Sequence, residues 1–132
     1  MADMKKICFV VQRYGLDVNG GAELLCRELA EHLSAEFDVS VATTKARDYQ
    51  TWKNEYPEDE EVIHGIYVRR FSTIRERDPE SFAQETMNFA NKILGIVERE
   101  KKWVLDQGPD CPELVRWLKN NKDNYDLFIM AP

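Results

Sequence analysis

An apolar run near the start of the chain constrains the fold more than any other feature. Residues 5–11 read KKICFVV. After its two lysines the segment is continuously apolar, and it is followed by QRYG. A parallel strand covered on both faces has this pattern, because the side chains on either face are removed from water. The run therefore predicts a central parallel strand.

A helix and a second strand follow this run. The helix is expected from about Ala22 to Ala35, and residues 37–44 (FDVSVATT) form a β-branched segment typical of a strand. The apolar face of the helix is predicted to hold Ala22, Leu25, Cys26, Leu29 and Leu33, with Leu24 outside it. A strand, helix and strand in this order cross over right-handed, which predicts an α/β fold with a three-layer, mostly parallel, Rossmann-like sheet.

The middle of the chain contains a long segment without clear periodicity. Residues 45–63 carry three aromatic residues among charges and are expected to be a loop, whereas residues 64–71 (HGIYVRRF) alternate as a third strand does. Asp78 is the expected N-cap of one long helix that ends before Gly108. Its apolar stripe is predicted to comprise Phe82, Thr86, Phe89, Ile93, Ile96, Val97, Trp103 and Val104.

The end of the chain predicts a short helix and a last strand. Pro112 begins the helix, which extends to about Lys119, and residues 125–130 (YDLFIM) form the strand. A parallel sheet rarely ends on a strand that no helix covers. We therefore expect residues 1–132 to be one truncated domain of a longer protein.

Composition limits the location and the partners. The chain has 132 residues, a formal net charge of -6 and 32% charged residues, which argues against nucleic acid as a partner. Its three cysteines are widely spaced, as in reduced cytosolic proteins, and no spacing predicts a metal site. No apolar run approaches the roughly 20 residues that cross a bilayer. The expected location is the cytoplasm.

Gly20 and Gly21 stand at the start of the first predicted helix. A Walker loop would need Lys and Ser or Thr after the last glycine, but Ala22 and Glu23 follow here. A dinucleotide loop would need G-x-G-x-x-G and an acidic residue that closes the second strand, but the glycines are differently spaced and the strand ends in Thr43 and Thr44. Two interpretations remain open. The unpaired amides of the helix start could bind a phosphate, or the glycines could only turn the chain.

Three segments in order resemble glycosyltransferase family 4, whose members have the GT-B fold. They are NGGAELLCRELAEHLSAEFDVSVATT, ARDYQTWKNEYPEDEEVIHGIYVRRF and WVLDQGPDCPELVRWLKNNKDNYDLFI, and the last two resemble one bacterial branch. The family places two Rossmann-like domains face to face. The C-terminal domain mainly holds the nucleoside diphosphate sugar, and the N-terminal domain mainly holds the acceptor. The resemblance implies that this chain is part of the N-terminal domain.

The resemblance also implies the chemistry. Gly20 and Gly21 would place backbone amides near the donor diphosphate, and the full-length protein would be a retaining enzyme that needs no metal or other cofactor. The family's histidine and paired glutamates have no counterpart before Pro132, so we expect no catalytic residue in this fragment. The implied acceptor is a glycan or a lipid-linked molecule. This fits cell-surface polysaccharide biosynthesis, peripheral association with the inner face of the membrane, and contact with the protein's own C-terminal domain.

Acceptor-binding candidates follow the second and third strands. Aromatic rings stack on the apolar faces of sugars, and charged groups bind hydroxyl groups or an anionic acceptor such as a lipid diphosphate. The alternative is that the rings only fix a long loop by burial and that the charges are solvated. The candidates are Arg47, Asp48, Tyr49, Trp52, Arg75 and Arg77.

Two other functions remain compatible with the sequence. One is a sugar-nucleotide epimerase of the same two-domain shape, with its carboxylates in a missing part. The other is a non-catalytic module that binds a glycan or a partner chain through Leu24 and the aromatic residues of the long loop. His32 and His64 have no acid or nucleophile at a recognisable spacing, which favours structural roles for both.

Overall fold

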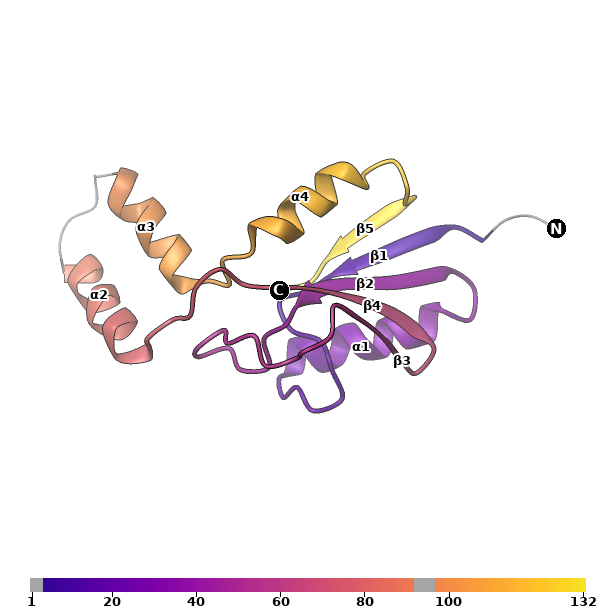
Figure 1. Cartoon of the computed structure of the whole chain (residues 1–132), viewed down its shortest axis with the longest axis horizontal. Coiled ribbons are helices and arrows are strands. Elements are labelled where there is room, and N and C mark those ends of the chain that lie inside the picture. Colours follow the sequence, from indigo (N-terminus) through magenta and orange to yellow (C-terminus); the bar gives the residue numbers. More distant parts are fainter. Residues whose placement is uncertain (1–3, 92–96) are drawn as a thin grey trace.

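A computed structural model describes residues 4–91 and 97–132 of the chain. Its sheet has the strand order β3-β4-β2-β1-β5 (Figure 1). β1 pairs in parallel with β2 and β5, β2 pairs in parallel with β4, and β3 pairs antiparallel with β4. The strands are β1 Lys6–Val10, β2 Asp38–Thr44, β3 Glu60–Ile63, β4 Ile66–Phe71 and β5 Leu127–Met130.

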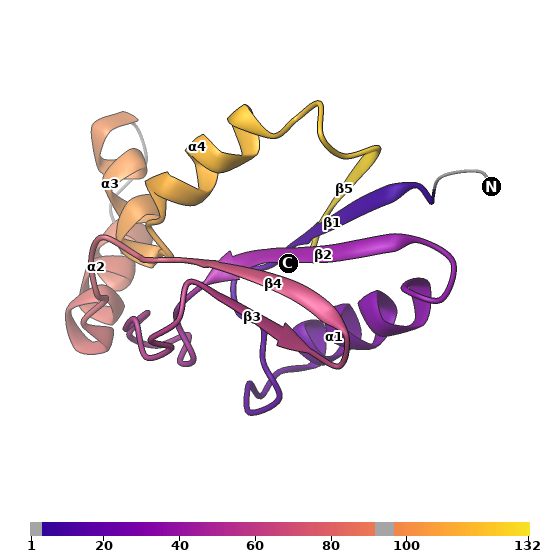
Figure 2. The same ribbon diagram turned by 45° about the vertical axis from the view of Figure 1, so that its right-hand side comes forward.

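β1 is the central buried strand that the apolar run predicts. Ile7 and Phe9 point into the core shared with helix α1 (Gly21–Leu33), whereas Cys8 and Val10 point into the core shared with helix α4 (Pro112–Asn120). The two helices cover opposite faces of the sheet (Figures 1 and 2). The result is a mixed α/β fold with a mostly parallel sheet, compatible with a Rossmann-like arrangement.

The expected loop 45–63 contains a strand at its end. β3 and β4 form a hairpin whose turn residues His64 and Gly65 have φ angles of 49° and 81°, as in the turns that favour two-residue hairpins. The sequence did not predict this strand, because the acidic residues of the segment are typical of a solvated loop. In the fold, Glu60 accepts a hydrogen bond from the Tyr67 hydroxyl at 2.6 Å, which supports the edge strand across the pair.

The single long helix expected after Asp78 is two helices, α2 (Pro79–Asn91) and α3 (Val97–Gln107). They form a helical hairpin beside the sheet (Figure 1). Phe82 stacks on Trp103 with ring centroids 5.8 Å apart, and the Trp103 indole N–H donates to Thr86 Oγ1 at 3.0 Å. Residues of the predicted apolar stripe therefore form the contact between α2 and α3. Ile93 and Ile96, and the side chains of Phe89 and Val97, lie outside the described residues.

The buried face of α1 differs from the predicted face. Cys26 and Ala30 are buried, whereas Leu25 and Leu29 are 57% and 45% exposed. Small side chains let a helix lie close to a sheet, and this turns the larger leucines onto the flank of the helix. Leu24 is exposed, as predicted.

Candidate functional site

The loops that follow the parallel strands meet at the carboxyl edge of the sheet. β1 continues through α1 to β2 on one side, while β5 pairs with β1 on the other side. The direction of strand order therefore reverses at β1. Open α/β sheets bind ligands outside the carboxyl ends of their strands at such a reversal.

A cavity of about 370 Å³ lies at this edge. Its wall comes from the glycine loop (residues 11–20), the first turn of α1, the aromatic loop (residues 45–59), the segment before α2 and the end of α3. The lining residues are Gln12, Arg13, Glu23, Tyr49, Trp52, Arg77, Gln107 and Gly108.

The two glycines have different surroundings. Gly20 is the N-cap of α1 with φ 145°, and a Cβ atom there would collide with the Glu23 carboxylate. Gly21 is the first residue of the helix, and a Cβ atom there would meet nothing within 4 Å. No side chain of the described residues caps the helix, whose first internal bond runs from the Leu24 amide to the Gly20 carbonyl at 3.0 Å. The amides before it have no hydrogen-bond partner among the described residues, as is usual for the first turn of a helix.

Arg13 connects the glycine loop to the rest of the cavity wall. The residue is 5% exposed, and its Nη1 donates to the Arg47 carbonyl at 3.0 Å. Its Nη2 donates to the Asn19 carbonyl at 2.9 Å and to Glu23 Oε1 at 2.7 Å. Sequence reasoning missed Arg13 and Glu23. The sequence did contain a signal for Arg13, because this positively charged residue lies between a buried strand and a glycine pair.

Trp52 fixes the aromatic loop to the end of α3. The residue is 4% exposed and has φ 60°, a left-handed conformation that is rare for a bulky side chain. Its indole N–H donates to the Gln107 carbonyl at 2.7 Å, and its ring lies so close to Gly108 that a Cβ there would stand 2.7 Å from two ring atoms. Thr73 Oγ1 donates to the Trp52 carbonyl at 2.8 Å. Sugar stacking by Trp52 stays a prediction.

Tyr49 is the accessible ring of the aromatic loop. It is 53% exposed, and the Arg13 guanidinium lies 5.2 Å from its ring centroid. The Asp48 carboxylate accepts from the Gln50 amide at 2.8 Å, which shapes the loop, and Arg47 pairs with Asp17 at 2.5 Å. Of Arg47, Asp48 and Tyr49, only Tyr49 lines the cavity.

Tyr56, the third ring of the aromatic loop, links this loop to the glycine loop. The Arg70 guanidinium lies 3.7 Å from its ring centroid, and its hydroxyl donates to Asp17. Burial raises the pKa of Tyr56 to about 12, and the hydrogen bond from Tyr56 lowers the pKa of Asp17. A Cβ on Gly15 would meet the Tyr56 hydroxyl, which explains a third glycine of the region.

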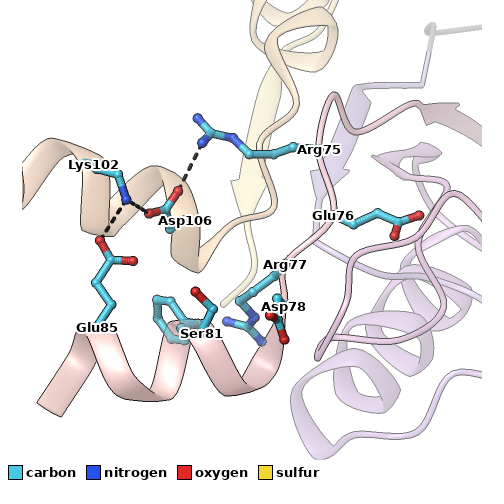
Figure 3. A pocket seen from close by; sticks show the side chains of 9 residues that line it. Arg75, Glu76, Arg77, Asp78, Ser81, Glu85, Lys102 and Asp106 are labelled. Atoms are coloured by element: carbon cyan, nitrogen blue, oxygen red, sulfur yellow. Dashed lines mark hydrogen bonds and ion pairs between the residues drawn. The ribbon is translucent and has the colours of Figure 1, made fainter.

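The two remaining arginine candidates, Arg75 and Arg77, have different partners. Arg77 donates to the carbonyls of Gln50 and Gln107, both at 2.9 Å, and to that of Tyr49, and burial lowers its pKa. Arg75 pairs with Asp106 and with Asp110. Arg75 and Arg77 both line a second hollow of about 270 Å³ between α2 and α3 (Figure 3). Of these two arginines, Arg77 also lines the cavity at the carboxyl edge, whereas Arg75 does not.

The histidines and cysteines lie away from this cavity. His64 Nδ1 is 2.6 Å from Glu31 Oε1 at the β3–β4 turn, which is at the amino end of β4. Cys8, Cys26 and Cys111 are free and buried, and burial raises the pKa of both Cys8 and Cys26 to about 11. Among the described residues, no group of three or more His, Cys, Asp and Glu could hold a metal ion.

In residues 4–91 and 97–132, no helix is both long enough and apolar enough to span a membrane. Comparison of the chain with profiles of known protein families, with curated proteins and with solved structures found no match.

Proposed function

We propose that the chain is the acceptor-side part of a glycosyltransferase that takes a sugar from a nucleoside diphosphate sugar. The observation that carries the proposal is the uncapped start of α1 at Gly21, beside a cavity of about 370 Å³ that is lined by Arg13, Arg77 and Tyr49. Helix-start amides and guanidinium groups bind phosphate oxygens, and an exposed ring packs on a sugar.

The finer assignment rests on the resemblance to family 4. It makes the full-length protein a retaining, metal-independent enzyme of GT-B fold, whose second Rossmann-like domain holds most of the donor. The acceptor is a glycan or a lipid-linked molecule at the cytoplasmic face of the membrane. The position of the cavity at the carboxyl edge supports this proposal, because a facing domain could bring a diphosphate to the open amides there.

A donor panel tests the activity. We expect the 132-residue chain to transfer no sugar, whereas a longer protein with a second domain transfers from one nucleoside diphosphate sugar. Transfer should be measured as release of the nucleoside diphosphate and as sugar incorporated into acceptor. Transfer by the 132-residue chain alone would contradict the two-domain proposal.

The glycine pair offers a test that does not require the acceptor. Gly21→Val in the longer protein adds a Cβ atom that meets no heavy atom of another part of the fold within 4 Å, so we expect the fold to tolerate it. If a diphosphate approaches this point, the variant should lose roughly tenfold to a hundredfold in nucleoside diphosphate affinity and in turnover, the scale of one charge-assisted hydrogen bond. Gly21→Ala is the matched smaller change. A folded Val variant that binds and turns over normally would remove the phosphate role.

A non-catalytic binding module is the second candidate. The observation that favours it is the exposed apolar flank of α1, where Leu24, Leu25 and Leu29 are 44% to 57% exposed. Exposed apolar side chains that cluster on one helix are typical of an interface. Failure of the longer protein to transfer sugar from any donor, together with loss of partner binding in Leu25→Ser, would favour this candidate.

A further inference from the structure

The wall of the cavity contains a nearly buried ion pair. Arg13 Nη2 and Glu23 Oε1 are 2.7 Å apart, and the two side chains are 7% and 14% exposed. Glu23 stands in the first turn of α1, and its carboxylate lies against the Cα atom of Gly20. A negative charge of the protein itself is therefore held at the helix start, next to the open amides.

The guanidinium of Arg13 is only partly satisfied by this pair. Nε and Nη2 form the edge that can bind an oxyanion through two parallel hydrogen bonds. On this edge Nη2 donates to Glu23 and to the Asn19 carbonyl, whereas Nε is buried and has no hydrogen-bond partner among the described residues. Leaving a buried N–H of a charged group unpaired is costly, so an added acceptor at this edge is favourable.

An oxyanion in the cavity would find two favourable groups together. They are the Nε–Nη2 edge of Arg13 and the unpaired amides of α1, which carry the positive end of the helix dipole. Glu23 competes for the first of these and repels an anion at the second. The same carboxylate therefore neutralises the site when no anion is bound.

We propose that Arg13 and the first turn of α1 bind a phosphate-type dianion, and that Glu23 is the competitor built into this site. Binding of the anion replaces the Glu23 carboxylate at Arg13 Nη2 and supplies an acceptor for Nε. The inference deepens the proposed function and rests on it for the identity of the anion, which would be the diphosphate of the donor.

Titration of the 132-residue chain with inorganic pyrophosphate tests the inference. Glu23→Gln keeps an oxygen that accepts from Arg13 and removes the charge. We expect it to bind pyrophosphate on the order of tenfold more tightly than the unchanged chain, as measured by calorimetry at fixed ionic strength. Arg13→Lys keeps the charge and loses the two-bond edge, so it should bind roughly tenfold more weakly.

A matched control comes from a second buried arginine. Glu61 pairs with Arg70 at 3.0 Å, and the Arg70 side chain is fully buried. Glu61→Gln changes the net charge as Glu23→Gln does, but the control residue lines no part of the cavity. It should leave pyrophosphate affinity unchanged. An equal gain in both variants would show a general charge effect and overturn the role of Glu23, as would no gain in Glu23→Gln.

One measurement on the unchanged chain needs no variant to fold. The ¹⁵N-resolved NMR signal of the Arg13 Nε–H should shift when pyrophosphate is added, and absence of both the shift and calorimetric binding overturns the anion site. The proposed function can fail separately. Pyrophosphate binding that depends on Glu23, in a longer protein that transfers no sugar, would preserve this inference and remove the glycosyltransferase proposal.

Discussion

The glycine loop and the aromatic loop both follow parallel strands and meet at the same edge of the sheet, but they use their residues differently. The aromatic loop directs its large side chain inward, where Trp52 bonds to Gln107 and packs on Gly108. The glycine loop is held by the Arg13 guanidinium and by the contacts of Asp17 with Arg47 and Tyr56, and it leads into an uncapped helix start. One loop therefore mainly joins parts of the fold, while the other leaves polar groups open to a ligand.

The largest expected effect is on the aromatic loop. Trp52→Ala should lower the free energy of unfolding by about 3–5 kcal/mol, the usual range for a buried Trp, because the ring is 4% exposed and ties the loop to α3. Denaturant unfolding measures this change. Tyr49→Ala, in which a 53% exposed ring is removed, is the control and should cost less than about 1 kcal/mol. Similar losses in both variants would erase the distinction between an anchoring ring and an accessible one.

An intermediate effect should separate the two glycines. Gly20→Ala should cost roughly 2 kcal/mol, because φ 145° is strained for any residue with a Cβ and the Glu23 carboxylate must move. Gly21→Ala should change stability by less than about 0.5 kcal/mol, since the added methyl meets no atom within 4 Å. Thermal or denaturant unfolding of the two variants gives the comparison. A greater loss at Gly21 would contradict the assignment of the turn to Gly20.

The smallest effect concerns the contact between the loops. The pKa of Asp17 lies below its usual value of 3.8, chiefly because the Tyr56 hydroxyl donates to its carboxylate. A carboxyl group whose pKa is lower in the folded state stabilises the protein above its unfolded pKa, and this contribution is lost as the pH falls through the folded value. Asp17→Asn should therefore reduce stability at pH 7 and lose this effect below about pH 4. An equal reduction at pH 3 and pH 7 would mean that ionisation of Asp17 is not involved.

Elements with a strong local pattern could be predicted from the sequence. The continuous apolar run gave β1, helical spacing after a glycine pair gave α1, and Pro112 marked the start of α4. The side chains of β1 alternate between two cores, which is why no polar position interrupts the run. Such patterns can be seen in the local sequence, because any layered α/β fold would bury the same faces of these strands and helices.

Elements whose pattern depends on a partner could not be predicted. β3 is acidic and forms a strand because it pairs with β4, where Tyr67 and Arg69 bind Glu60 and Arg70 binds Glu61. α2 and α3 are separate helices that contact each other through Phe82 and Trp103, whereas the apolar stripe of the sequence runs through both. Periodicity alone therefore could not separate α2 from α3.

The candidate site shows the same division. The sequence by itself determined that a glycine pair opens a helix after a buried strand, and that aromatic and basic residues follow the next strands. Only the tertiary structure decided that Trp52 is buried against Gly108, 56 residues later in the chain, and that Arg13 pairs with Glu23 across the helix start. Pairings of this kind depend on how loops from different strands meet at one edge of the sheet. The strength of the interaction between two charges depends on how deeply this arrangement buries them.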